Sequence, residues 1–68
     1  MVNSKRLKQR IRESGYRVDF VAKACGLSYY GFQQKMSGKY EFKASEIKAV
    51  ARLLDLTDQE IREIFFND

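Results

Sequence analysis

The segment 22–32 constrains the fold of this chain more than any other. An apolar-periodic run stops at Gly26, one apolar residue follows, and a second periodic run begins after Ser28 and ends near Gly38. Gly26 can adopt the left-handed conformation that closes a helix. Ser28 can cap the next helix by accepting a hydrogen bond from a free backbone amide. The segment therefore predicts two short helices joined by a tight turn, supported by the rest of the chain.

Length and composition indicate one small all-α domain. The chain has 68 residues, which is near the lower limit for a domain that folds alone, and it has no proline to interrupt helices. Its single cysteine, Cys25, cannot form an internal disulfide, which indicates a reducing compartment. No apolar run is long enough to cross a membrane, and the amino terminus lacks the apolar segment of a signal peptide. We therefore expect a cytoplasmic protein.

The sequence lacks the residues on which most enzyme sites depend. It contains no histidine, which is the usual general base, and no glycine-rich phosphate loop or cluster of metal ligands. We therefore expect no catalytic activity, no cofactor, no metal and no small-molecule substrate.

Charge is distributed unevenly along the chain. Residues 1–40 hold nine Lys or Arg and two acids, a net charge of +7, whereas residues 41–68 hold four Lys or Arg and seven acids, a net charge of −3. A one-sided positive field suits a polyanion such as duplex DNA. The same charges could also form a solvated surface, and charge alone leaves both interpretations open.

Hydrophobic spacing and capping residues predict five helices. Their expected ranges are 4–14, 18–25, 29–37, 44–55 and 58–65. The clearest amphipathic pattern lies in 44–55, where apolar residues recur at i, i+3, i+4 and i+7. Thr57 and Glu60 have the spacing of a capping box, which fixes the start of the last helix. We expect Phe42, in the preceding loop, to pack into the core.

The helix 29–37 has two distinct faces. At about 100° per residue, Phe32 and Met36 fall on one stripe, which we expect to face the core. The opposite face carries uncharged side chains that can donate or accept hydrogen bonds: Tyr30, Gln33, Gln34 and Ser37. Tyr29 lies at the border of the two faces, so its burial and its exposure are equally compatible with the pattern.

The two-helix unit and the segments after it carry a family resemblance. Counted from position 18, the fifth residue is small, the ninth is glycine, and the tenth and fifteenth are apolar. These four are Ala22, Gly26, Leu27 and Phe32. Together with segments 35–39, 42–47, 53–57 and 64–66, this pattern resembles lambda-repressor-like DNA-binding domains, and among them compact Cro/repressor-type phage regulators of Gram-positive hosts. The resemblance covers about residues 5–66 and implies a five-helix domain with a helix-turn-helix motif at about 18–37.

Three positions depart from the family pattern. One is Lys43, a poor capping residue at the expected start of the helix 44–55 unless Ser45 serves as the cap. Many members carry a glutamine that contacts phosphate where this chain has Val18, so Arg17 or the backbone amide of Asp19 must supply that contact, or it is absent. Lys35 stands where many members have an apolar residue, and Met36 takes over the core position.

The resemblance implies a transcriptional regulator that binds operator DNA in a bacterial host cell, associated with the nucleoid. The helix 29–37 would enter the major groove. The residues expected to face bases are Ser28, Tyr29, Tyr30, Gln33, Gln34 and Ser37. The residues expected to contact phosphates are Arg17, Lys23, Lys35, Lys39 and Tyr40.

Proteins of this type usually bind DNA as two-fold dimers, so a homodimer is expected at least on DNA. Ile64, Phe65 and Phe66 are the candidate dimer surface, although Phe66 could instead fold back on the core. A rival interpretation makes the chain a protein-interaction module that modulates a second phage regulator. Under that interpretation Tyr29, Tyr30 and the uncharged helix face form a protein interface.

Overall fold

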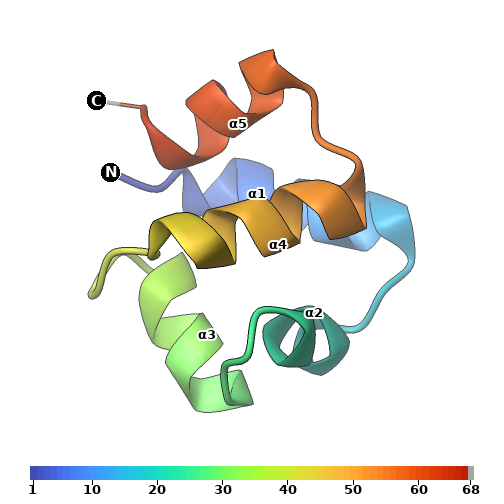
Figure 1. Ribbon diagram of the computed structural model, residues 1–68, viewed down its shortest axis with the longest axis vertical. Coiled ribbons are helices and arrows are strands. Elements are labelled where there is room, and N and C mark those ends of the chain that lie inside the picture. Colours follow the sequence, from blue (N-terminus) through green and yellow to red (C-terminus); the bar gives the residue numbers. More distant parts are fainter. Residues whose placement is uncertain (68) are drawn as a thin grey trace.

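The computed structural model describes residues 1–67 and contains five α-helices (Figure 1). These are α1 (Ser4–Ser14), α2 (Val18–Ala24), α3 (Tyr29–Met36), α4 (Ala44–Leu54) and α5 (Asp58–Phe65). No residue in the described range forms a strand. The all-α, five-helix prediction is confirmed, and each helix end lies within one residue of its predicted position. Within the same range, none of the helices has the length and apolar character needed to cross a membrane.

Helix α4 occupies the middle of the molecule. It packs against α1, α2 and α5, with α5 on one side and α2 and α3 on the other (Figure 1). Every helix contributes two buried apolar side chains to a single core: Leu7 and Ile11, Val21 and Ala22, Phe32 and Met36, Val50 and Leu54, and Ile64 and Phe65. Each helix is too short to be stable alone in water, so this shared core is what holds α3 in place.

Phe42 closes the core from the loop between α3 and α4. Its ring makes edge-to-face contacts with Phe32, at a centroid distance of 5.7 Å, and with Phe65, at 5.3 Å. Such aromatic pairs stabilise a core beyond the area that they bury. The prediction that Phe42 packs into the core is confirmed.

Part of the predicted dimer surface is wrong. Ile64 is fully buried and Phe65 is 7% exposed, because both lie on the face of α5 that packs against the rest of the same domain. Only Phe66, which ends α5, remains accessible, with 62% of its surface exposed. Phe66 therefore does not fold back on the core either.

Two arginines of α1 join the first helix to the last two. The Arg6 and Arg10 guanidinium groups bind the Glu60 carboxylate at 3.1 and 3.0 Å, and Arg10 also donates to the Leu54 carbonyl at 2.9 Å. Glu60 completes the predicted capping box as well, since it accepts from the backbone amide of Thr57 at 3.0 Å. These two arginines are consequently structural.

Candidate nucleic-acid interface

The turn between α2 and α3 closes both helices. Gly26 has a φ of 77°, its amide donates to the Lys23 carbonyl at 2.9 Å, and the amide of Leu27 donates to the Ala22 carbonyl at 3.0 Å. This pattern is a Schellman motif, which needs a left-handed residue and so favours glycine. The Ser28 hydroxyl then accepts from the Gly31 amide at 3.0 Å and caps α3. The turn predicted from the sequence is confirmed.

The two faces of α3 are separated as the angular count predicts. Phe32 and Met36 are buried, whereas Tyr29 is 54% and Tyr30 is 71% exposed. Ser37 is exposed, and two glutamines, Gln33 and Gln34, are half-buried. Helix α3 therefore presents an uncharged, hydrogen-bonding surface outward while its apolar stripe anchors it.

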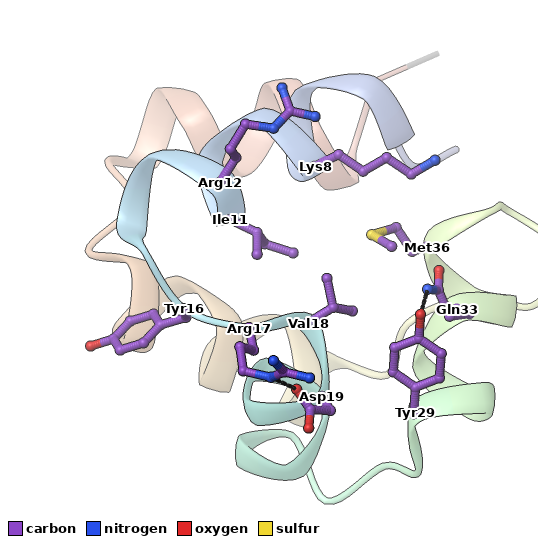
Figure 2. A pocket seen from close by; sticks show the side chains of 10 residues that line it. All are labelled: Lys8, Ile11, Arg12, Tyr16, Arg17, Val18, Asp19, Tyr29, Gln33 and Met36. Atoms are coloured by element: carbon purple, nitrogen blue, oxygen red, sulfur yellow. Dashed lines mark hydrogen bonds and ion pairs between the residues drawn. The ribbon is translucent and has the colours of Figure 1, made fainter.

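Hydrogen bonds within this surface fix some side chains and leave others available. The Gln33 side-chain amide donates to the Tyr29 hydroxyl at 2.7 Å (Figure 2). The Ser28 and Ser37 hydroxyls bond to nearby backbone groups, so both are occupied locally. Among residues 1–67, the side chains of Tyr30 and Gln34 have no hydrogen-bond partner. Those two polar groups are free to bind a ligand.

Lys35 has a different place from the one predicted. Its ammonium group donates to both carboxylate oxygens of Glu46, at 2.7 and 2.9 Å, and its side chain is only 15% exposed. Burial alone would raise the pKa of the Glu46 carboxyl, but the hydrogen bonds from Lys35 and from the Lys43 amide outweigh burial and lower it. The assignment of Lys35 to phosphate is therefore corrected: it is an internal ion-pair partner that joins α3 to α4.

The other predicted phosphate contacts remain on the surface. Arg17, Lys23, Lys39 and Tyr40 are all exposed. The Arg17 guanidinium binds the Asp19 carboxylate at 3.1 Å, and this hydrogen bond lowers the pKa of Asp19. The Lys39 ammonium lies 5.9 Å from the centre of the Tyr40 ring, within the range of a cation–π contact. Lys39 and Tyr40 follow α3 in the chain, and Arg17 lines a groove together with Tyr29 and Gln33 of α3.

A groove between α1, α2 and α3 adds residues that the sequence did not single out (Figure 2). Its apolar floor includes Ile11, Val18 and Met36, and Tyr29 and Gln33 line it from α3. The remaining lining residues are mostly charged: Lys8, Arg12, Tyr16, Arg17 and Asp19. Lys8 and Arg12 were hidden among the basic residues of α1, and no local signal separates them from Arg6 and Arg10, which have the same four-residue spacing.

Cys25 offers no reactive group. Burial raises the pKa of its thiol to about 11, with a further contribution from the nearby Glu46 carboxylate. At neutral pH it is a thiol rather than a nucleophilic thiolate. Within the described part of the chain, no three His, Cys, Asp or Glu side chains gather as metal ligands would.

Comparisons with known proteins identify the family but no activity. No curated protein and no solved structure matches the chain significantly. One family model, described as "Protein of unknown function (DUF739)", matches residues 2–68 and so spans nearly the whole chain. The chain therefore belongs to the DUF739 family.

Proposed function

We propose that this protein is a sequence-specific DNA-binding regulator with a lambda-repressor-like helix-turn-helix, in which α3 enters the major groove. The observation that carries the proposal is the construction of α3. A Schellman turn and a serine cap hold the helix rigidly, its apolar stripe is anchored, and its exposed face bears hydrogen-bonding groups without charge. Arg17 shares a groove with Tyr29 and Gln33, and Lys39 follows the end of α3; cations beside the helix suit one that reads bases between two phosphate backbones.

Gln33 is oriented in a way that suits adenine. One N–H of its side-chain amide is held by the Tyr29 hydroxyl, which leaves the carbonyl oxygen and the second N–H free. Those two groups are the acceptor and donor with which glutamine binds adenine bidentately. Each such pair is worth about 1–3 kcal/mol of discrimination, or roughly a 5- to 150-fold preference. Gln34 and Tyr30 supply further contacts on the same face.

The decisive experiment is selection of bound duplexes from a random pool, followed by affinity measurements on the selected duplex and on a scrambled one. Gln33→Ala and Gln34→Ala should each lose preference for the selected sequence but keep affinity for the scrambled duplex. Gln59→Ala is the matched control, because Gln59 is an exposed glutamine on α5. Neutralising about four to six phosphates predicts a slope of log K against log salt of roughly −4 to −5. A slope near zero, or unchanged preference in both variants, would refute the proposal.

A second candidate function rests on the exposed tyrosines. Tyr29 and Tyr30 place two adjacent, accessible aromatic side chains at the start of α3, and tyrosine is enriched in protein interfaces. The chain would then bind a second phage regulator through α3. This candidate is favoured if random duplex is not retained at low salt while a neighbouring regulator binds tightly.

The proposed regulator acts as a homodimer on DNA, with a reduced dimer surface around Phe66. Met1 and Tyr40 line a groove together with Phe66, and they are 85%, 58% and 62% exposed, respectively. Two copies would place their α3 helices on half-sites about 34 Å apart.

A further inference from the structure

The cations of α1 fall into two groups with different surroundings. Arg6 and Arg10 are bound to Glu60, as described above. Lys5, Lys8 and Arg12 are exposed and have no ion-pair partner among residues 1–67. Their spacing of i, i+3 and i+7 places them along one side of the helix. The fold thus neutralises one row of positive charge on α1 and leaves a second row open.

The open row borders the groove beside α3. Figure 2 shows Lys8 and Arg12 reaching out from α1, with Tyr29 and Gln33 across the groove on α3. Arg17 lies at the α2 end of the same groove. Gln33 belongs to the groove and to the proposed base-reading face, so the groove is continuous with that face.

We propose that this groove holds the sugar–phosphate backbone of duplex DNA, with Lys8 and Arg12 as phosphate contacts. This inference rests on the proposed function and names one edge of its binding site. Three cations line the groove against a single carboxylate, Asp19, which is already bonded to Arg17.

The spacing and position of the two α1 cations match a nucleic-acid strand. Lys8 and Arg12 are four residues apart, or about 6 Å along the helix. Over that length a DNA strand carries about two charges, at one per ~3.4 Å of axis. An acidic protein segment would also satisfy the charges. The continuity with Gln33 favours DNA, because a backbone borders the major groove on each side of the bases that a recognition helix reads.

The test compares two double variants of identical chemistry. Lys8→Gln/Arg12→Gln removes the α1 pair, and Lys48→Gln/Arg52→Gln removes an exposed Lys and Arg at the same i, i+4 spacing on α4, which do not line the groove. Affinity for selected and scrambled duplexes is measured over a range of salt. Loss of two phosphate contacts should reduce the magnitude of the slope of log K against log salt by about 1.8, which corresponds to about 60-fold weaker binding at 0.1 M salt. Both duplexes should be affected equally, while the α4 variant keeps most of the slope.

The opposite perturbation acts on the same groove. Asp19→Asn removes its carboxylate and should tighten duplex binding by up to about 8-fold at 0.1 M salt, the effect of one charge. Circular dichroism and thermal melting establish that each variant is folded. This arm also keeps the inference testable if the α1 variant fails to fold.

The outcomes separate the two proposals. If the wild-type protein does not bind duplex DNA, the proposed function fails and this inference fails with it. If wild type binds but the α1 and α4 variants weaken equally, or Asp19→Asn does not tighten binding, the groove assignment alone is overturned. Unchanged duplex binding by Lys8→Gln/Arg12→Gln, together with loss of binding to labelled poly-glutamate, would assign the groove to an acidic protein segment and also overturn it.

Discussion

Replacement of Glu46 by glutamine tests what holds α3 at its angle to the rest of the domain. Glu46 is 6% exposed, and its carboxylate accepts two hydrogen bonds from the Lys35 ammonium and one, at 2.8 Å, from the Lys43 amide. Glu46→Gln keeps the shape but removes the negative charge. The Lys35 ammonium, itself mostly buried, would then lack an anionic partner.

The expected loss of stability is large for a domain of this size. Removing one partner of a buried ion pair costs about 3–5 kcal/mol. The glutamine oxygen can still accept one hydrogen bond, so we expect about 2–3 kcal/mol. A chain of 68 residues has a free energy of unfolding of roughly 3–10 kcal/mol. At about 4–8 °C per kcal/mol, the melting temperature should fall by about 8–24 °C.

The assay is urea and thermal unfolding of a double-mutant cycle with Lys35→Met. The doubly substituted protein should be more stable than the sum of the single effects predicts, by more than about 1 kcal/mol, because it leaves no buried unpaired charge. Glu63→Gln, an exposed carboxylate on α5, is the control and should change stability by less than about 0.5 kcal/mol. A loss below about 0.5 kcal/mol for Glu46→Gln, or additive effects in the cycle, would refute the reasoning.

Two further predictions concern acid stability and assembly. The backbone amide of Thr57, opposed by burial and aided by Arg10, lowers the pKa of Glu60, and the pKa of Glu46 is also lowered. The contribution of these two carboxylates to the free energy of unfolding is therefore complete above the unfolded-state pKa of about 4.3 and is lost as pH falls through their lower folded-state pKa values. Urea unfolding measured across this pH range should show that Glu60→Gln loses less stability on acidification than wild type. Phe66→Ser should shift sedimentation toward monomer without lowering the melting temperature of the monomer, and a wild-type protein that stays monomeric with and without its DNA site would contradict the proposed dimer.

Local rules made most of the fold predictable. Asn3, Ser28 and Thr57 cap helices by bonding to amides within three residues, and each is recognisable from the sequence because both partners are neighbours. The buried faces also follow from helical spacing, since each helix buries one stripe. What failed was the assignment of Ile64 and Phe65 to a dimer surface, since both also lie on the inner apolar face that helical spacing predicts for the last helix. The apolar stripe of the last helix has the same sequence pattern whether it packs against its own core or against a second copy of the chain.

Long-range charge pairing could not be predicted, because it depends on how the helices are oriented. Arg6 and Glu60 are 54 residues apart, so nothing local distinguishes Arg6 from Lys8. The fold makes that distinction by turning one row of α1 toward α5 and the other toward the groove. For the same reason, the candidate site could be predicted along α3 but not across to α1.

The departure at Lys35 and the lack of a capping side chain at the start of α4 have a common solution. Lys43 occupies the cap position of α4 and has no side-chain acceptor to offer. Glu46, one turn later, accepts from the Lys43 amide and neutralises Lys35 with the same carboxylate. A cation at a position where the sequence resemblance predicts an apolar residue is thereby accommodated in the interface between α3 and α4. The ion pair therefore acts together with the buried Phe32 and Met36 in setting the rotation of α3, so Glu46→Gln should weaken the proposed sequence preference as well as stability.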